Sequence, residues 1–391
     1  MSYKVTELVS KIKGGRSILN SLVIIPSIRN HAVISSYIYN ATKHNFDTNE
    51  LFFLILVEDF SDKDAYITEL KQNKVNGIVM NQKDRDDFLK KNDLEELENL
   101  IPKRSHAETS FGLVYLWMHK EYEYAFFIDD DTEPENDFDY FGDHIKNLNF
   151  TGEITEISSD KNWVNVLYQN YEKRQLYPRG YPYSKKGEKV KRRKTNVNKG
   201  DVWISQGLWT NVPDLDAVRI LMDGDLNGQS MTRLNISDFS ENFVVAKNNF
   251  LTICSMNLAI RREVIPFYYQ FPMDDNPWRI GRFDDIWSGI IAKKVLDQIQ
   301  KFIITGFPLC RHNKAVRSTF KDVNLEAPGY ESNEYISESL SALKLKSIDI
   351  VENSLSISES LENNGKTEFI RYCGNKLKKW VVRISQDIRE I

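Results

Sequence analysis

The sequence is poor in cysteine and in long apolar runs. Its 391 residues contain three cysteines, none in a CxxC pair or at a Cys/His ligand spacing. This excludes a disulfide scaffold and a zinc finger, and it is typical of reduced thiols in the cytosol. The apolar segment SLVIIP at 21–26 is far shorter than the roughly 20 residues of a membrane span. We therefore expect a soluble, cytoplasmic protein.

Several common enzyme motifs are also missing. The chain has no GxxxxGK[ST], GxGxxG, HExxH or GxSxG pattern, which argues against P-loop NTPases, typical dinucleotide enzymes, zincins and α/β-hydrolases. The net charge of −4 is too small to indicate nucleic acid or another polyanion as a partner. One basic stretch, Lys185–Lys199, is interpreted as a solvated loop. Its alternatives are a lid over a phosphorylated ligand and a contact with an acidic membrane or partner.

Apolar runs alternate with charged, helix-compatible segments through the first third of the chain. SLVIIPSIRN at 21–30, LFFLILVED at 51–59 and VNGIVM at 75–80 predict buried strands. This alternation is typical of an α/β fold with a mostly parallel sheet covered on both faces. In such sheets ligands bind beyond the carboxyl ends of the strands. Arg29 and Asp59 stand at such ends.

Three carboxylates follow a further apolar strand, YAFFI at 124–128. In an extended backbone Asp129 and Asp131 point to one side and Asp130 to the other. Two carboxylates about 5–6 Å apart repel by roughly 3 kcal/mol at an effective dielectric constant near 20. Mg²⁺ or Mn²⁺ offsets this repulsion, because it binds carboxylates together with phosphate oxygens and water. A metal site for a diphosphate is one interpretation, and a solvent-exposed acidic turn or a helix N-cap is the other.

Seven segments carry a resemblance to a known family. They read VIIPSIRN, FFIDDDT, YPRGYPYS, QGLWTNVPDLDA, MNLAIRREVIP, IGRFDDIWSG and TGFPLCRHNKA. Their order resembles that in reversibly glycosylated polypeptides, the UDP-arabinopyranose mutases and their prokaryotic relatives, from about Leu22 to Tyr335. The resemblance implies a Rossmann-like, glycosyltransferase A-type fold, a UDP-sugar substrate, and Mn²⁺ or Mg²⁺. It also implies a pyranose–furanose interconversion that serves polysaccharide biosynthesis.

The resemblance implies roles for individual residues. Asp129 and Asp131 match the metal-binding aspartates, and His312 stands where the family has a histidine that is a candidate third ligand. Arg179 in YPRGYP matches the arginine that becomes reversibly glycosylated. Because a guanidinium stays protonated and suits a diphosphate, we expect Arg179 to bind phosphate or stabilise the transition state. A covalent acceptor and a structural salt bridge are the alternatives.

Two further carboxylates complete the expected catalytic group. Asp284 and Asp285 match the family's GRYDD segment and are expected to hold sugar hydroxyls or act as a base, with capping of a helix N-terminus as the alternative. The expected substrate contacts are Arg29 and Arg282 (phosphate or sugar), Asp59 (uracil or ribose), Lys103 (diphosphate), and Asp130, whose role is unassigned.

The chain beyond Tyr335 does not match the family. Apolar residues spaced by three to four positions in two runs, Ile336–Val351 and Phe369–Ile388, predict two amphipathic helices. We expect a nucleotide-sugar domain over 1–334 and a helical extension over 335–391. The extension either packs on that domain or forms a homo-oligomer interface.

The leading functional hypothesis is therefore a metal-dependent UDP-sugar mutase of the UDP-arabinopyranose type. The second is a glycosyltransferase that moves a sugar from a UDP-sugar to a glycan, lipid or protein. The third is a non-catalytic subunit that binds nucleotide sugar. The family often has cysteine where Thr132 follows the triplet, and this departure leaves the identity of the sugar open.

Overall fold

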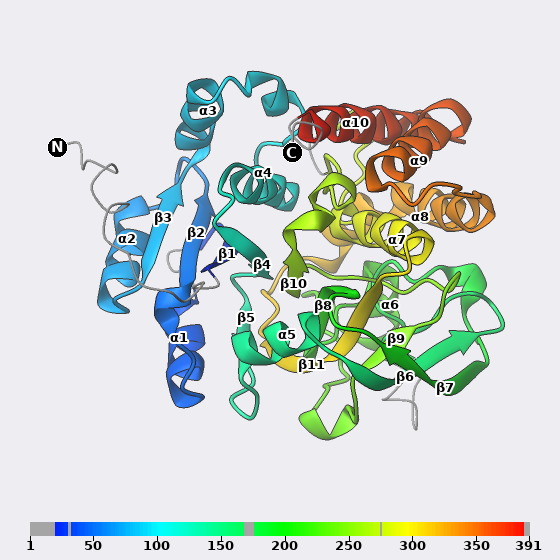
Figure 1. The fold of residues 1–391 in the computed structure, drawn as a ribbon, viewed down its shortest axis with the longest axis horizontal. Helices are drawn as coiled ribbons and strands as arrows, with labels where there is room; N and C mark the ends of the chain where they lie inside the picture. The colour runs from blue at the N-terminus through cyan, green and yellow to red at the C-terminus, as the bar shows by residue number, and fades with distance from the viewer. Residues whose placement is uncertain (1–19, 30–32, 168–175, 274–275, 387–391) are drawn as a thin grey trace.

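The computed structural model describes residues 20–29, 33–167, 176–273 and 276–386, which contain a sheet of eleven strands (Figure 1). The strands are β1 (Asn20–Ser27), β2 (Leu51–Val57), β3 (Asn76–Met80), β4 (Tyr122–Ile128), β5 (Thr132–Pro134), β6 (Gly152–Ser159), β7 (Val190–Val197), β8 (Val202–Asn211), β9 (Phe243–Val245), β10 (Asn257–Arg261) and β11 (Phe302–His312). Their order is β3-β2-β1-β4-β10-β8-β11-β9-β6-β7, and β5 pairs with β11.

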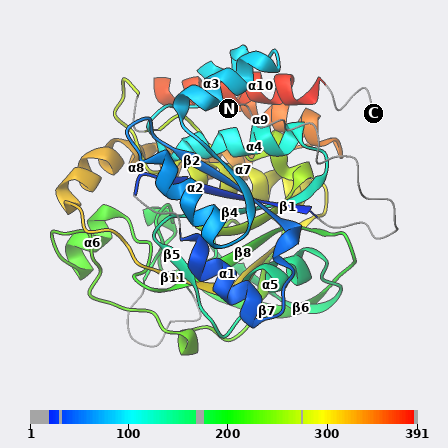
Figure 2. The ribbon, with the colours of Figure 1, turned by 90° about the vertical axis from the view of Figure 1, so that its left-hand side faces the viewer.

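Helices cover both faces of this sheet. They are α1 (Ile34–Lys43), α2 (Lys63–Gln72), α3 (Gln82–Lys91), α4 (Ser110–Met118), α5 (Tyr140–Leu148), α6 (Ala217–Asp223), α7 (Asp284–Gln298), α8 (Thr319–Ala342), α9 (Ile350–Asn364) and α10 (Glu368–Ser385). Two 3-10 helices, η4 (His106–Thr109) and η8 (Arg262–Phe267), matter below. Figures 1 and 2 place α1 and α5 on one face of the sheet, and α3, α4 and α7 on the other.

The N-terminal half of the sheet is parallel and fully covered. β1 pairs in parallel with β2 and β4, and β2 with β3. Every residue of β2 except Phe52 is buried, because helices lie against both faces. The strands predicted at 21–30, 51–59, 75–80 and 124–128 are confirmed within a few residues at each end.

One reversed strand joins the two halves of the sheet. β10 runs antiparallel to both β4 and β8, while β11 is parallel to β8. It follows that β1, β2, β3, β4, β8 and β11 share one direction. The predicted α/β fold, with a mostly parallel sheet and a C-terminal helical region, is confirmed. The insertion of a reversed strand was not predicted.

The basic stretch Lys185–Lys199 is not a loop, and this interpretation was wrong. Most of it is β7, the edge strand that pairs antiparallel with β6. Its basic side chains are largely exposed, and Arg192 and Arg193 form ion pairs with Glu241 and Glu156. Charged side chains on an edge strand discourage pairing with another chain. The stretch lacks the alternation of apolar residues by which strands are usually recognised.

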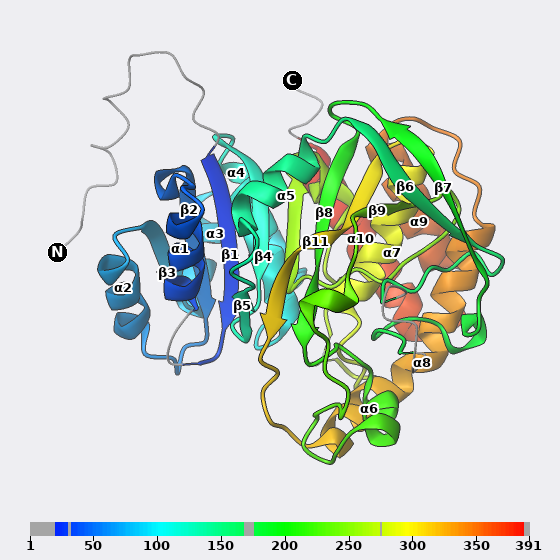
Figure 3. The ribbon, with the colours of Figure 1, turned by 90° about the horizontal axis from the view of Figure 1, so that it is seen from below.

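Three helices, rather than two, make up the C-terminal region. The predicted helix over 336–351 is divided between the end of α8 and the start of α9, whereas the predicted second helix corresponds to α10. Residue 335 lies inside α8, and the division into two domains there stays a prediction. The C-terminal helices lie over the part of the sheet away from β3 (Figures 1 and 3). Among the described residues, no helix combines the length and apolar character that a membrane span requires.

Helix α10 packs on the main body through aromatic residues. Trp380 is fully buried, its indole Nε1 donates to the Ile265 carbonyl of η8 at 3.0 Å, and its ring stacks on Tyr269 with centroids 5.1 Å apart. Phe369, at the other end of α10, lies 5.8 Å from the ring of Trp287 in α7. These contacts show that α10 packs on α7 and η8, as expected if the extension packs back on the rest of the chain.

We predict that Trp380→Ala lowers the free energy of unfolding by about 3–5 kcal/mol, because it leaves a cavity and an unpaired carbonyl between α10 and η8. Urea denaturation monitored by circular dichroism measures the change. Val382→Ala, at an exposed position of the same helix, is the matched control and should change stability by less than about 0.5 kcal/mol. Equal effects of the two substitutions would show that α10 does not stabilise the main body.

Candidate functional site

A cleft of about 590 Å³ opens at the carboxyl ends of the parallel strands. Its walls come from the ends of β1, β2, β4 and β11, the segment around η4, and the first turns of α7 and α8. Most of the predicted site residues line this cleft. They are Asp129, Asp130, Asp131, Arg179, Arg282, Asp284, Asp285 and His312.

Three predicted residues lie elsewhere. Arg29 stands beside the triplet, with its Nε 3.2 Å from Asp130 Oδ1. Asp59 is exposed outside the cleft. Lys103 is held on the surface by Glu98, whose Oε1 lies 2.6 Å from Lys103 Nζ. The structure therefore does not support substrate-binding roles for Asp59 and Lys103.

The residues adjacent to Asp59 and Lys103 line the cleft instead. Glu58, at the end of β2, and Arg104 contribute to its wall, and each stands one position from a predicted site residue. Glu58 is buried, and its carboxylate has no hydrogen-bond partner among the described residues. Burial raises the pKa of Glu58, and Arg85 and Arg104 partly counter the rise.

The acidic triplet forms a turn, and the expectation of an extended segment was wrong. The amide of Thr132 donates to the Asp129 carbonyl at 3.2 Å, so the three carboxylates point to different partners. Asp130 Oδ2 accepts from Ser27 Oγ at 2.8 Å, and Asp131 Oδ2 lies 3.7 Å from His312 Nε2. Each carboxylate has its own donor or cation, which offsets the repulsion within the triplet.

His106, which was not predicted, joins the triplet to α7. Its Nε2 lies 3.1 Å from Asp129 Oδ1, and its Nδ1 lies 2.9 Å from Asp284 Oδ2. Burial alone lowers the pKa of His106, but the two carboxylates raise it well above the ordinary value. An imidazolium therefore donates to both. Its position 23 residues before Asp129 gave no local signal in the sequence.

Arg179 lies between two buried carboxylates. Its Nε donates to Asp214 at 3.0 Å, and its two terminal nitrogens donate to Asp285 at 3.1 and 3.3 Å. The remaining hydrogens point to the Arg282 carbonyl and, at 3.9 Å, to Cys254 Sγ. Burial raises the pKa of Asp214, but the positive charges around it, led by Arg179 and followed by Lys314, together lower that pKa to about 2. All five donors of the guanidinium have protein partners, so this geometry matches the salt-bridge alternative.

The opposite wall of the cleft carries a buried lysine without a partner. Lys314 has 9% of its surface exposed, and among the described residues no carboxylate or carbonyl accepts from its ammonium. Neighbouring Arg282 is held by Glu326, whose Oε1 lies 2.5 Å from Arg282 Nε. Burial, followed by the charge of Arg282, lowers the pKa of Lys314. The negative charges of Asp214, Asp322 and Glu326 oppose this lowering, but none of these carboxylates accepts a hydrogen bond from the ammonium, which leaves its donors available to a bound anion.

Asp131 and His312 have the chemistry of a divalent-cation site. The His312 Nδ1 donates to the Val212 carbonyl at 2.7 Å, which orients Nε2 toward Asp131, as is usual for metal-binding histidines. Within the described ranges, no group of three His, Cys, Asp or Glu residues forms a metal site on its own. The pair therefore fits a cation that completes its coordination with phosphate oxygens and water.

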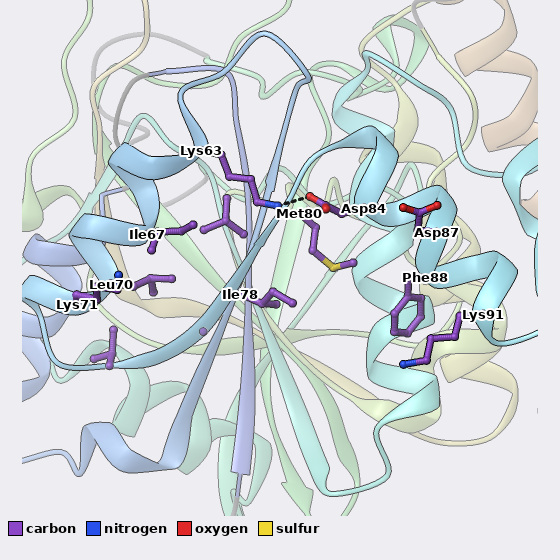
Figure 4. A pocket seen from close by; sticks show the side chains of 13 residues that line it. Lys63, Ile67, Leu70, Lys71, Ile78, Met80, Asp84, Asp87, Phe88 and Lys91 are labelled. Atoms are coloured by element: carbon purple, nitrogen blue, oxygen red, sulfur yellow. Dashed lines mark hydrogen bonds and ion pairs between the residues drawn. The ribbon is translucent and has the colours of Figure 1, made fainter. Parts of the chain in front are cut away.

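A larger groove, of about 890 Å³, lies at the edge strand β3 between α2 and α3 (Figure 4). Its lining is mostly apolar, with Ile67, Ile78 and Phe88 among its side chains. Lys63 and Asp84 form an ion pair across it. None of the predicted site residues lines this groove.

A buried ion pair connects the ends of two strands to the η4 wall of the cleft. Arg85 Nη2 lies 2.9 Å from Glu108 Oε2, and Arg85 Nη1 also donates to the carbonyls of Val57 and Met80, at the ends of β2 and β3. Burial raises the pKa of Glu108 to about 7 and outweighs the opposing effect of Arg85. Arg85 therefore ties the ends of two strands to the η4 segment.

The chain is similar in sequence to a known protein family. The family described as "Reversibly glycosylated polypeptide" matches residues 52–382. The chain belongs to this family. The resemblance inferred from the seven segments is thus confirmed, and the match extends through α9 and most of α10, which the sequence reading had left outside the family.

Curated relatives are UDP-arabinopyranose mutases. UDP-arabinopyranose mutase 1 of Oryza sativa subsp. japonica is 30% identical over 208 residues, which is 51% of this chain and 49% of that protein. Probable UDP-arabinopyranose mutase 2 of Solanum tuberosum is 30% identical over 236 residues, 58% of this chain and 56% of that protein. The chain therefore spans about half the length of the curated relatives it matches.

Solved structures with a similar outline are glycosyltransferases. S. aureus TarS 1-349 in complex with UDP-GlcNAc has a TM-score of 0.36 and 11% identity, covering 94% of this chain and 73% of that one. The mannosyltransferase PcManGT from Pyrobaculum calidifontis, in complex with GDP-Man and Mn²⁺, has a TM-score of 0.35 and 10% identity, covering 94% and 87%. These superpositions are too loose to assign a ligand or a mechanism.

We predict that Arg179→Lys lowers the free energy of unfolding by about 3–5 kcal/mol, since one ammonium cannot serve both Asp214 and Asp285 and a buried carboxylate is left unpaired. Urea denaturation at neutral pH measures this loss. Arg233→Lys is the control, because Arg233 is exposed. If Arg179→Lys were as stable as the control, the guanidinium would not hold the two carboxylates together.

A second prediction concerns Glu108. Because its folded-state pKa lies above its unfolded value of about 4.5, protonated Glu108 stabilises the fold below pH 4.5, and this contribution is lost as pH rises to about 7. Glu108→Gln cannot titrate. The stability difference, wild type minus variant, should therefore fall by roughly 3 kcal/mol between pH 4.5 and 7. A pH-independent difference in urea denaturation would contradict the raised pKa.

Proposed function

We propose that this protein is a UDP-sugar-dependent enzyme that uses a divalent cation, and that its reaction is a pyranose–furanose interconversion of the UDP-sugar. One observation carries the proposal. The cleft sets Asp131 and His312, a pair with metal-ligand chemistry, beside Lys314, a buried cation without a hydrogen-bond acceptor among the described residues. This arrangement is complementary to a metal-bound diphosphate. Family membership and the mutase names of the relatives support the choice of reaction.

Each part of the substrate has a matching part of the cleft. Glu58 and Arg104 lie where β2 and the η4 segment meet, and Glu58 can accept from an N–H or O–H of the nucleoside. Lys314 can donate to phosphate oxygens, since its ammonium has no protein acceptor. Bound at Asp131 and His312, Mn²⁺ or Mg²⁺ would neutralise diphosphate charge and act as a Lewis acid on the leaving oxygen.

The sugar end of the cleft is built from fixed carboxylates. His106 orients Asp284, and Arg179 with the amide of Ser255, 3.2 Å from Asp285 Oδ2, orients Asp285. Carboxylates held in this way can position sugar hydroxyls with little loss of entropy on binding. Lys314 would stabilise the negative charge that develops on UDP when the anomeric C–O bond breaks. The O4 hydroxyl of the pyranose would then bond to C1 and pass its proton to the ring oxygen as the bond between C1 and that oxygen breaks. The retained UDP would re-form its bond to C1 of the furanose.

Arg179 has a positioning role in this scheme. Its five donors are occupied by Asp214, Asp285, Arg282 and Cys254, so it fixes Asp285 rather than contacting the diphosphate. The expectation that its guanidinium binds phosphate is replaced by one in which Lys314 does so.

The reaction can be tested directly by NMR of purified protein with Mn²⁺ and, separately, UDP-arabinopyranose, UDP-galactose and UDP-xylose. We expect one of these to be converted to its furanose form, and Asp131→Asn to lose the conversion. If all three sugars stay unchanged while a sugar appears on an added glycan, lipid or protein, the mutase proposal is wrong and the glycosyltransferase hypothesis replaces it.

We further predict that Lys314→Gln raises the Kd for UDP in the presence of Mn²⁺ by about 30-fold, which corresponds to about 2 kcal/mol for a lost charge-assisted hydrogen bond. Isothermal titration calorimetry measures the change. Lys103→Gln is the matched control, since Lys103 lies on the surface outside the cleft. Stability should not fall in Lys314→Gln, because no protein partner is lost. An unchanged Kd would exclude Lys314 from the diphosphate site.

A further inference from the structure

Asp130, the middle residue of the acidic triplet, is bound by the end of β1. Its Oδ2 accepts from Ser27 Oγ at 2.8 Å and from the amide of Ile28 at 3.2 Å. Its Oδ1 forms an ion pair with Arg29, whose Nε lies 3.2 Å away. Ser27 is itself fixed, because it is buried and its Oγ lies 3.0 Å from the hydroxyl of Tyr66 in α2. Both oxygens of Asp130 are thus occupied by one segment of the chain, which fits an anchoring role better than contact with a substrate.

The guanidinium that Asp130 anchors also reaches the next carboxylate. Arg29 Nη2 lies 3.7 Å from Asp131 Oδ2, the same oxygen that His312 Nε2 approaches at 3.7 Å. At this length neither contact is a hydrogen bond. The Arg29 side chain is 31% exposed, and Ile28, which precedes it, lines the cleft. Arg29 therefore supplies positive charge to Asp131 from beside the cleft without holding its carboxylate firmly.

We propose that Arg29 exchanges partners when the site is filled: it pairs with Asp131 in the cation-free protein and with the diphosphate when a divalent cation is bound. The inference rests on the proposed function, since it takes Asp131 as a ligand of that cation. A guanidinium and a divalent cation on one carboxylate oxygen repel each other, so Arg29 Nη2 has to leave Asp131. The ion pair of its Nε with Asp130 keeps it beside the site.

The end of Arg29 that is released suits a phosphate. A guanidinium presents its N–H groups in a planar fork that matches phosphate oxygens. Substrate phosphates commonly complete the coordination of a cation that one or two carboxylates hold, so the diphosphate would lie next to Asp131. An arginine anchored at the adjacent residue is within reach of it.

This exchange makes the binding of the two ligands interdependent. Without a diphosphate, a cation at Asp131 displaces Arg29 and leaves two positive charges close together. With UDP present, the displaced guanidinium gains a phosphate partner. UDP therefore raises the affinity for the cation, and by linkage the cation raises the affinity for UDP by the same factor. We infer a site that takes up its cation together with the nucleotide.

A structural ion pair is the alternative role for Arg29, and the two roles predict different signs. If Arg29 only held the triplet in shape, its loss would weaken the binding of both the cation and UDP. If Arg29 exchanges partners, its loss removes a competitor of the cation and a donor to the diphosphate. Cation binding alone should then become tighter, while UDP binding becomes weaker.

Two binding constants of the full-length protein at neutral pH test the proposal. Electron paramagnetic resonance of free Mn²⁺ gives the Kd for Mn²⁺ without nucleotide, and isothermal titration calorimetry gives the Kd for UDP at saturating Mn²⁺. We expect Arg29→Gln to lower the first Kd by about tenfold, because a competing positive charge is lost. It should raise the second by about tenfold, because a charge-assisted hydrogen bond is lost.

Arg233→Gln is the matched control, because Arg233 is exposed and does not line the cleft. It should leave both constants unchanged. Arg29→Lys keeps the charge but has one ammonium for two partners, so it should shift both constants in the same directions as Arg29→Gln by smaller factors. Urea denaturation should show that both Arg29 variants fold like the wild type.

The proposal is overturned if Arg29→Gln weakens Mn²⁺ binding, as the structural role predicts, or if either constant matches that of the Arg233→Gln control. A wild type that binds neither Mn²⁺ nor UDP would refute the proposed function, and this inference with it. A wild type that binds both, with constants that do not depend on Arg29, would refute this inference alone.

Discussion

Electrostatic repulsion at the carboxyl edge of the sheet is the constraint on which the site depends. Nine carboxylates line the cleft at this edge, and the fold places cations between six of them. These six carboxylates belong to Asp129, Asp130, Asp131, Asp214, Asp284 and Asp285. Arg29 and His312 lie beside carboxylates of the triplet, and His106 bridges Asp129 and Asp284. Arg179 donates hydrogen bonds to Asp214 and Asp285. Because each cation bridges elements far apart in the sequence, the same contacts that offset repulsion also fix the geometry of the cleft.

This arrangement also limits what each charged group can do. All the hydrogen-bond donors of the Arg179 guanidinium have protein partners. Arg179 therefore positions carboxylates and has no free donor for a phosphate. Lys314 differs, since it is buried and no hydrogen bond from its ammonium is found among the described residues, although the negative charges of Asp214, Asp322 and Glu326 act on it. In the proposed function, a diphosphate would supply the hydrogen-bond acceptors that this ammonium lacks. Binding sites often contain groups that are stable only when the ligand is present.

The sequence predicted the elements that are uniformly buried or have one apolar face, and the site residues that lie in a recognisable family segment. β2 and β4 are apolar throughout because both faces of the sheet are covered, and α10 keeps one apolar face toward η8. β7 could not be found in this way, since an exposed edge strand has no apolar pattern to detect. His106 and Lys314 become visible only when the fold brings η4 and the end of β11 to one edge. Glu58 was missed by one position, because adjacent side chains at a strand end point to different sides.

Family membership narrows the chemistry but does not by itself select the reaction. A mutase and a glycosyltransferase both need a cation, a diphosphate site and a means of breaking the anomeric C–O bond. They differ in the group that then reacts with the sugar, which is its own hydroxyl in a mutase and an acceptor in a glycosyltransferase. In this cleft the carboxylates nearest the sugar end, Asp284 and Asp285, are each bound by a neighbouring cation. The His106 ring holds the pKa of Asp284 below its ordinary value against the effect of burial, whereas burial raises the pKa of Asp285 despite the nearby Arg179, so Asp284 is the weaker base of the two. Both carboxylates are held in fixed positions, which suits the binding of sugar hydroxyls in the proposed reaction.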